Sequence, residues 1–364
     1  FLLLSCKINS PYLCSISWNI SLFLLNFKKK INTNNKILVL YKSFGSDDVE
    51  FIKKNEKNKF NFFYFPRNNL KIIFNCFFKK IENDLTDDKY FSNNNQIELA
   101  KKEYRNFLIK ILKIFNKRNN FLGILSFNFR YKAEKELQIA CRLTDIKFIV
   151  CQKESLHYND KSAITDLYIK VNSKNGSYNG DYITVYTEKF KKVLIEASIC
   201  SAEKIYVVGM PRADYFFKNI DAQKKHILLL MPFWKPPQIL KTKISFDQEQ
   251  YSKNITDVIV DFAQKNPQEN IVIKTKMFDK TDNSLDLIIQ QKKIKNIILK
   301  KGGSSKNLIK DAKVVVGFQS TGLIEALILR KPIIVPLFNL NLNQTFQECT
   351  LKLDEIAYYA KDRI

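Results

Sequence analysis

The sequence predicts an α/β fold built from two Rossmann-like domains that face each other across a cleft. Short apolar runs rich in β-branched residues alternate with segments of helical spacing along most of the chain, as in open sheets of parallel strands. A charge-rich stretch, Lys218–Lys225, divides these elements into two series of similar size, and 364 residues are enough for two cores. We therefore expect an N-terminal extension over residues 1–35, a first domain over 36–220 and a second over 221–364.

The first domain is predicted from apolar runs that each lead into a helical segment or a polar turn. The expected strands are the run that begins at Lys36, Phe62–Phe65, Phe121–Phe127, Ile146–Cys151, Tyr182–Val185 and the run that begins at Lys204. The expected helices are Val49–Lys54, Leu70–Ile81, Ile97–Phe115, Lys132–Leu143 and Glu188–Ala197, with Asn83–Asn95 as a polar loop.

The second domain repeats this alternation. Its expected strands are the run that begins at Ile227, Ile271–Ile273, Ile294–Leu299, Val314–Val316 and Pro332–Val335. Its expected helices are Ser252–Lys265, Lys306–Ala312 and the apolar segment after Gly322. Because the sequence begins with Phe1 rather than Met and stops soon after a partial helix, we expect a fragment truncated at both ends.

The net charge of +24 suits nucleic acid, an anionic membrane surface or a phosphorylated ligand. Only eight of the sixty basic residues are Arg, and no signature of a nucleic-acid-binding module is present, so we expect no nucleic-acid partner. Seven scattered Cys and two His without a Cys-x-x-Cys pair argue against structural zinc. Scattered Cys in a long chain indicate a reduced compartment, so we expect a cytoplasmic protein.

Two apolar segments raise the question of a membrane. Leu13–Phe27 is too short and too interrupted by serine for a spanning helix, and Lys28, Lys29 and Lys30 follow it, the reverse of a signal peptide. We expect an extra packed element or a segment that lies on a surface. Leu70–Ile81 is a basic amphipathic segment that either packs on the sheet or docks on a membrane. Peripheral contact with an anionic membrane, at its inner face, therefore stays open.

The most informative segment is Val314–Pro336, a strand–turn–helix–strand unit. Its turn contains Gly317, Gln319, Ser320, Thr321 and Gly322. The turn follows a strand and begins a helix, where free backbone N–H groups and the helix dipole attract anions. We therefore expect a phosphorylated ligand at this turn.

Thr321 and Glu325 are four residues apart and so share one helix face. Ser320 or Thr321 either caps the helix or binds a phosphate oxygen. A capping box would place the acid three residues after the cap, where Leu323 or Ile324 stands. Glu325 is therefore expected to accept hydrogen bonds from paired hydroxyls, as on a ribose.

Three cations are further candidates for the same ligand. Lys274 and Lys276 follow the expected strand Ile271–Ile273 and are either phosphate ligands or ordinary surface lysines. Arg212 belongs to a Gly-Met-Pro turn, where it makes a specific pairing or serves the domain junction structurally.

Glu154 and His157 follow the expected strand Ile146–Cys151 and are our candidates for a general base, with a solvent-facing loop as the alternative. Asp47, Asp48, Asn128 and Arg130 would line the same rim. The sequence contains no Asp-x-Asp, no Walker A loop and no G-x-G-x-x-G, so we expect neither a metal nor a bound cofactor.

The segment GFQSTGLIEALILRKPIIVP resembles the donor-site motif of GT-B-type proteins of bacterial surface and capsular polysaccharide synthesis, which are related in fold to UDP-N-acetylglucosamine 2-epimerases and CDP-glycerol glycerophosphotransferases. The matching positions are Gly317, Ser320, Thr321, Glu325, Ala326, Leu327, Lys331 and Pro332. Lys204–Phe217 resembles the Gly-x-Pro-Arg-x-Asp segment of the same group, through Gly209, Pro211, Arg212 and Asp214. Phe127–Ser155 is also similar, and the likeness covers about residues 36–345.

This resemblance implies that Ser320 and Thr321 contact a nucleotide diphosphate and that Glu325 contacts its ribose. It implies a metal-independent glycosyltransferase that moves a sugar from a nucleotide-sugar donor to a glycan or lipid-linked acceptor. Several relatives carry Lys-x-His-Pro where this chain has Lys274, Thr275, Lys276 and Met277, which argues against glycerophosphate transfer. A sugar-nucleotide epimerase and a catalytically silent GT-B scaffold stay open as alternatives.

Overall fold

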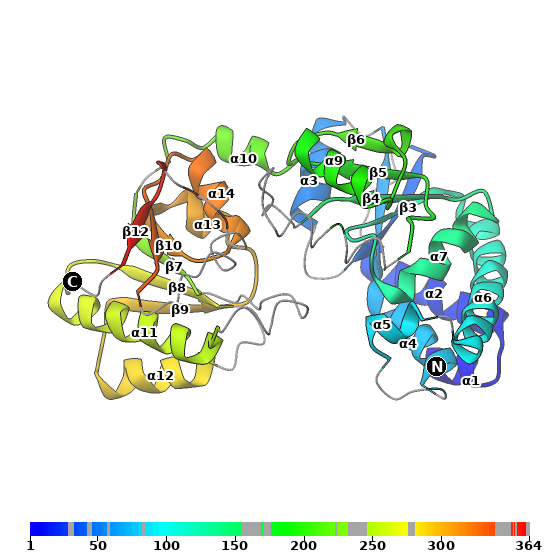
Figure 1. Cartoon of the computed structure of the whole chain (residues 1–364), viewed down its shortest axis with the longest axis horizontal. Helices are drawn as coiled ribbons and strands as arrows, with labels where there is room; N and C mark the ends of the chain where they lie inside the picture. Colours follow the sequence, from blue (N-terminus) through cyan, green and yellow to red (C-terminus); the bar gives the residue numbers. More distant parts are fainter. Residues whose placement is uncertain are drawn as a thin grey trace. The chain divides into compact units, whose positions relative to one another are not determined.

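The computed structural model describes residues 1–27, 33–41, 46–56, 59–79, 81, 85–92, 94–153, 169, 176–222, 224–231, 246–275, 281–338, 351, 353 and 355–361. These residues form two compact units (Figure 1). The first holds the described residues up to Pro211, and the second holds those from Arg212 onward.

The first unit is built on a six-stranded parallel sheet in the order β2-β1-β3-β4-β5-β6. Its strands are β1 (Lys36–Tyr41), β2 (Asn61–Pro66), β3 (Phe121–Ser126), β4 (Lys147–Cys151), β5 (Tyr182–Val185) and β6 (Ile205–Val207). The order reverses between β1 and β3, so the carboxyl ends of these two strands flank the switch point where open α/β sheets bind ligands.

The helices of this unit are α1 (Leu2–Lys7), α2 (Pro11–Asn26), α3 (Ser46–Asn55), α4 (Arg67–Phe78), α5 (Asp87–Tyr90), α6 (Asn95–Asn119), α7 (Lys132–Arg142), α9 (Glu188–Glu196) and the 3-10 turn η1 (Ala202–Lys204). The long α6 begins where the Asn94 side chain accepts from the backbone N–H groups of Gln96 and Ile97. It ends at Asn120, whose left-handed φ of 54° stops the helix.

The N-terminal extension forms helices that pack onto the first sheet. Trp18 of α2 is buried, and its ring lies 4.9 Å from that of Phe65 and 5.5 Å from that of Phe115. No helix within the described ranges combines the length and apolar character needed to cross a membrane.

The second unit has its own six-stranded parallel sheet, in the order β12-β11-β10-β7-β8-β9. Its strands are β7 (His226–Leu230), β8 (Ile271–Thr275), β9 (Ile297–Lys301), β10 (Ala312–Gly317), β11 (Ile333–Pro336) and β12 (Tyr358–Ala360). Read in chain order, this is the 3-2-1-4-5-6 arrangement of a Rossmann sheet, with its switch point between β7 and β10.

The helices of the second unit are α10 (Ala213–Phe217), α11 (Gln248–Lys265), α12 (Thr281–Gln291), α13 (Lys306–Lys310) and α14 (Thr321–Ile328). The long α11 is capped by Asp247, whose side chain accepts from the backbone N–H groups of Glu249 and Gln250. The buried side of α11 includes Tyr251, Ile255 and Ile259.

The α/β class and the two Rossmann-like sheets are therefore confirmed. The cleft between them stays a prediction. Several expected bounds were wrong because turn residues joined their neighbouring elements: β8 continues through Thr275, α13 ends at Lys310 and β10 begins at Ala312. The polar segment Asn83–Asn95 contains the short helix α5, which buries Tyr90. Helix α12 and strand β12 were not expected.

Candidate functional site

The predicted phosphate-binding turn lies at the switch point of the second sheet. Gly317 ends β10 and stands opposite Leu230, which ends the neighbouring strand β7. The turn from Gly317 to Thr321 then leads directly into α14. The strand order thus brings the turn to the position in an open parallel sheet where a ligand meets both strand ends and a helix N-terminus.

The turn is tight because its backbone passes close to β7. A Cβ added to Gly322 would lie 2.6 Å from Leu230 Cδ1, so glycine allows α14 to pack closely against the strand. Gln319 has a left-handed φ of 53°, and its side-chain oxygen accepts a hydrogen bond from the backbone N–H of Leu351 at 3.0 Å. Phe318 is buried and anchors the turn, with its ring 5.3 Å from that of Tyr251.

Ser320 is the N-cap of α14, and its hydroxyl oxygen accepts from the backbone N–H of Gly322 at 3.2 Å. The capping role that the sequence allowed is therefore observed. Thr321 is half-buried, and neither its backbone N–H nor its hydroxyl makes a hydrogen bond to another described residue. The first turn of α14 thus presents donors that the described fold does not use.

Glu325 and Arg212, which the sequence identified separately, form an ion pair. Arg212 Nε donates to Glu325 Oε1 at 2.7 Å, and both side chains are only 9% exposed. The pair ties the turn that precedes α10 to the second turn of α14. The partner of Arg212 lies 113 residues away in the chain. Its expected contact with a ligand stays a prediction.

The lysine on β8 lies differently from what the sequence indicated. Lys274 was expected just past the strand, but it lies within β8, where it is half-buried and its ammonium donates to the carbonyl of Thr275 at 2.6 Å. The buried hydroxyl of Thr275, at the carboxyl end of β8, has no hydrogen-bond partner in the described part of the chain. This group was not predicted from the sequence, although a Thr that ends an apolar strand is a usable signal.

Three predicted site residues, Lys276, Glu154 and His157, lie outside the described residues. Lys331 of the matched motif precedes β11 and therefore lies at the opposite, amino edge of the sheet. Burial lowers the pKa of Lys331.

A second polar cluster, also missed from sequence, lies at the switch point of the first sheet. Glu134 of α7 is fully buried and accepts hydrogen bonds from the hydroxyl of Ser126, which ends β3, and from Arg67, which begins α4. The Arg67 guanidinium also stacks on the Tyr131 ring, 3.5 Å from its centre. Burial raises the pKa of Glu134, while Arg67 and Ser126 act in the opposite direction.

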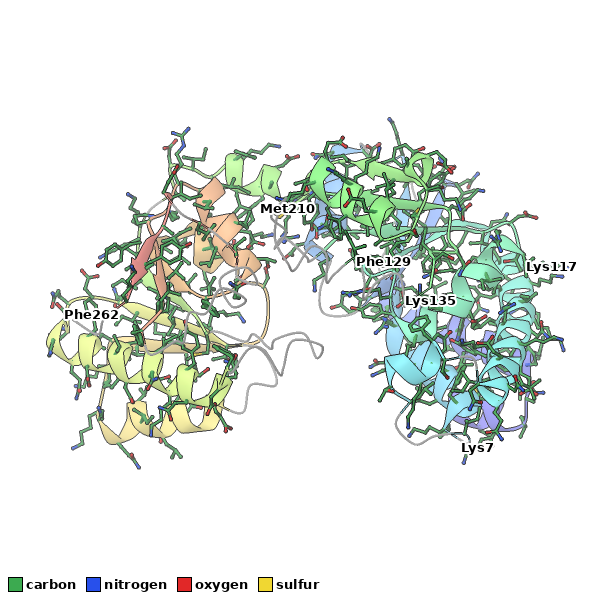
Figure 2. All side chains as sticks on the ribbon, in the orientation of Figure 1. Lys7, Lys117, Phe129, Lys135, Met210 and Phe262 are labelled. Carbon is green, nitrogen blue, oxygen red and sulfur yellow. The ribbon has the colours of Figure 1, made fainter. Side chains whose placement is uncertain are left out.

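The helix α7 carries further buried charges. Glu136 accepts from Arg105 at 2.6 Å and from the Tyr90 hydroxyl at 3.2 Å. Lys135, on the same helix (Figure 2), is also buried, and desolvation lowers its pKa to about 8. The side chains of Glu134, Lys135 and Glu136 therefore face protein rather than solvent.

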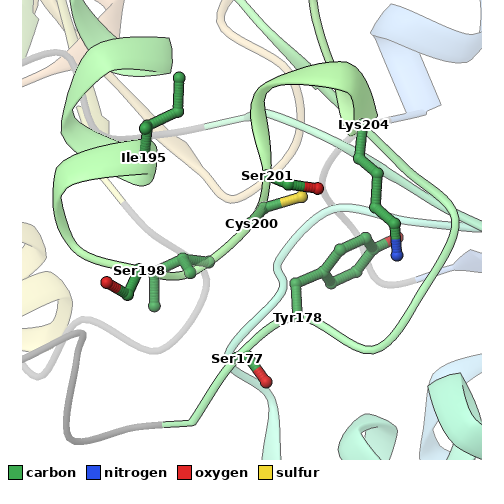
Figure 3. Close-up of a pocket in the computed structure, with 8 residues that line it drawn as sticks. Ser177, Tyr178, Ile195, Ser198, Cys200, Ser201 and Lys204 are labelled. Carbon is green, nitrogen blue, oxygen red and sulfur yellow. The ribbon is translucent and has the colours of Figure 1, made fainter.

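A hollow of about 340 Å³ in the first unit lies at the other edge of its sheet, where β5 and β6 begin (Figure 3). Its polar groups serve the fold: the Tyr178 hydroxyl donates to backbone carbonyl oxygen, and Lys204 donates to the carbonyl of Gly180 at 3.2 Å. Burial raises the pKa of the Cys200 thiol to about 11, so it stays protonated near neutral pH. This hollow offers no set of groups for catalysis.

Solved structures with a similar fold include two UDP-GlcNAc 2-epimerases. The enzyme from Methanocaldococcus jannaschii is 15% identical, with 90% of this chain and 89% of that chain covered and a TM-score of 0.49. The enzyme from Neisseria meningitidis, solved with UDP-GlcNAc, is 14% identical, with 82% of each chain covered and a TM-score of 0.46. The wall teichoic acid polymerase TagF is 12% identical, with 96% and 84% covered and a TM-score of 0.45.

A comparison with curated protein sequences finds no match. Residues 222–337, however, match the family described as "Capsule polysaccharide biosynthesis protein". This stretch contains the switch point, the Gly317–Thr321 turn and α14. The resemblance of the second unit to proteins of capsule polysaccharide biosynthesis is therefore confirmed.

Proposed function

We propose that this protein is a glycosyltransferase that moves a sugar from a nucleotide-sugar donor to a glycan or lipid-linked acceptor in surface polysaccharide synthesis. The observation that carries the proposal is the turn at the β7–β10 switch point, where Thr321 offers an N–H and a hydroxyl that no described residue uses. This turn lies within the segment that matches the capsule polysaccharide family.

The donor diphosphate binds at the start of α14 in this proposal. Backbone N–H groups and the helix dipole face the phosphate oxygens, and the hydroxyls of Ser320 and Thr321 donate to them. Gln319 and Lys274 add donors at the same strand ends, and Lys276, which follows β8 in the sequence, is a further expected phosphate ligand. The Arg212 guanidinium holds Glu325 in one orientation, so that its carboxylate accepts from the ribose hydroxyls.

Transfer then needs one bond made and one broken. The acceptor hydroxyl oxygen attacks C1 of the sugar, the bond from C1 to the diphosphate breaks, and the nucleotide diphosphate leaves. Donors positioned at the phosphates stabilise the negative charge of the leaving group. Glu154 or His157, beyond the carboxyl end of β4, takes the acceptor proton.

The decisive experiment is calorimetry with nucleoside diphosphates and the variant Thr321→Val, which keeps the shape of the side chain and removes its hydroxyl. We expect affinity to fall by about tenfold, the effect of one hydrogen bond to a charged group. The control is Thr144→Val in the first unit, because the Thr144 hydroxyl donates only to carbonyls in the last turn of the preceding helix α7. Thermal unfolding of both variants checks that the fold is kept.

Unchanged affinity in Thr321→Val, with binding still present, would overturn the proposed donor site. Incubation with candidate UDP-sugars alone separates the remaining enzyme class, because an epimerase releases a modified sugar without an acceptor. Nucleotide binding without turnover of any donor–acceptor pair would instead identify a silent scaffold.

A further inference from the structure

The first two helices carry an unusual concentration of exposed apolar side chains. Within residues 1–27, the exposed large apolar side chains are Phe1, Leu3, Leu4, Ile8, Tyr12, Ile20, Phe23, Leu24, Leu25 and Phe27. Phe23 is 68% exposed and Leu24 is 63% exposed, more than most of the other exposed large apolar residues that the structure describes. A cluster of this kind on a folded protein marks a surface that another body covers.

The two faces of α2 are the reverse of those of an ordinary surface helix. Its buried residues are Cys14, Ser15, Ser17, Trp18 and Leu22, small or polar apart from two. Its exposed stripe contains Tyr12, Ile20, Phe23 and Leu24, at spacings that bring them to one side of the helix. The helix has no charged residue. A helix that is apolar on its outer side as well is normally covered on both sides.

Specific contacts fix α2 in this orientation. The Asn26 side chain donates to the Tyr64 carbonyl at 2.9 Å and accepts from the Tyr64 N–H at 3.0 Å, so it pairs with the outer edge of β2. The Asn69 amide donates to the Ser21 hydroxyl at 2.9 Å. Because these polar groups are paired inward, the apolar stripe of α2 is held outward.

The charge of the N-terminal segment indicates which kind of partner covers its apolar surface. The first 46 residues contain six lysines and no aspartate or glutamate, and the first acid is Asp47. Lys7 lies in the last turn of α1 and is exposed (Figure 2). An apolar surface within a purely cationic segment matches an anionic lipid surface, which attracts each lysine electrostatically.

We propose that α1 and α2 dock this protein onto an anionic lipid bilayer, with both helices lying in the interface. The 16 residues of α2 give a helix about 24 Å long, shorter than the hydrocarbon core, so it lies along the surface rather than crossing it. The exposed aromatic and aliphatic side chains enter the region of the acyl chains, and Lys7 faces the headgroups. This docking is independent of the proposed sugar transfer.

The test is co-sedimentation of the full chain with vesicles of phosphatidylcholine alone and of phosphatidylcholine mixed with phosphatidylglycerol. We expect binding to the mixed vesicles that weakens with salt, and little binding to the neutral ones. The double variant Phe23→Ser with Leu24→Ser should lower the partition coefficient by at least about tenfold. The control replaces exposed apolar residues elsewhere in the first unit, Leu143→Ser with Tyr206→Ser, and should bind like the parent.

A further variant, Phe23→Trp, reports insertion through quenching of its fluorescence by lipids brominated on their acyl chains. We expect quenching above that of the parent chain, whose Trp18 is buried. Three outcomes would overturn the proposal. They are no binding to anionic vesicles, equal binding by the Phe23→Ser, Leu24→Ser variant, or a parent chain that forms a dimer while that variant is monomeric and the control variant is still dimeric. The last outcome would assign the surface to a second copy of this chain.

Discussion

In each unit, a glutamate on the helix that follows a switch-point strand pairs with an arginine from another part of the unit, but the two pairs differ in their surroundings. In the first unit, Glu134 is wholly buried and is also bonded to Ser126 at the end of β3. In the second unit, Glu325 pairs with Arg212 beside a helix start where the Thr321 donors have no partner among described residues. The first pair uses its strand-end hydroxyl internally, whereas beside the second pair the Thr321 hydroxyl and backbone N–H make no hydrogen bond to a described residue.

We propose that the two ion pairs serve different purposes. A carboxylate sealed between an arginine and a hydroxyl joins helices α4 and α7 to β3. A carboxylate held next to unused donors can orient a bound molecule. Breaking the first pair should therefore affect mainly the stability of the fold, and breaking the second should affect mainly the affinity for nucleotides.

The largest effect is expected for Arg67→Met, which leaves the buried Glu134 without its cationic partner. We expect the free energy of unfolding to fall by about 3 kcal/mol at neutral pH, measured by urea denaturation. Arg67 lowers the pKa of Glu134, so its loss raises that pKa further. A carboxyl whose pKa is raised on folding favours the fold only while protonated, so the loss should shrink in acid and grow as pH rises.

The matched control is Arg142→Met, because Arg142 is an exposed arginine in the last turn of α7. Arg67→Met should leave nucleotide affinity unchanged wherever the protein is folded. A stability loss independent of pH would show that Glu134 is not the group left uncompensated.

The next effect concerns the second pair. Glu325→Ala should remove nucleotide binding, a loss of affinity of about a hundredfold or more, because it deletes the proposed ribose ligand and leaves Arg212 without this carboxylate. Calorimetry measures the affinity, and urea denaturation of the same variant measures the accompanying loss of stability. A folded Glu325→Ala protein with the affinity of the parent would remove the ligand role and leave the pair purely structural, like that of the first unit.

The smallest effects on stability are expected for alanine substitutions at two glycines, one in each unit. A Cβ at Gly123 in β3 would lie 2.9 Å from the backbone oxygen of Lys147, which moves little, whereas at Gly322 it would meet the terminal carbon of Leu230. We expect Gly123→Ala to cost about 1–3 kcal/mol and Gly322→Ala less than about 1 kcal/mol, because helix propensity favours alanine at the second site. Equal losses of stability for the two variants in thermal unfolding would mean that β7 and α14 cannot move apart to accommodate the added Cβ.

Much of this architecture follows from local sequence. The β-branched runs such as Val314–Val316 predicted strands, and apolar residues at intervals of three and four predicted helices such as α6 and α11. The Ser320 cap and the glycines on either side of it, Gly317 and Gly322, were also predicted, because a helix start depends on residues that are neighbours in the chain. The expected roles of Lys276, Glu154 and His157 stay predictions, since those residues lie outside the described part of the chain.

By itself, the sequence determined the α/β class, the two series of strands and the place of the turn between β10 and α14, because spacing and turn chemistry act over a few residues. Only the tertiary structure decided the order of the strands, the pairing of Arg212 with Glu325 and the burial of Glu134, Lys135 and Glu136 on α7. It also decided that the apolar side of α2 faces outward. Such contacts join residues far apart in the chain. Which of them form depends on how whole helices and strands pack, and short-range sequence patterns do not determine that packing.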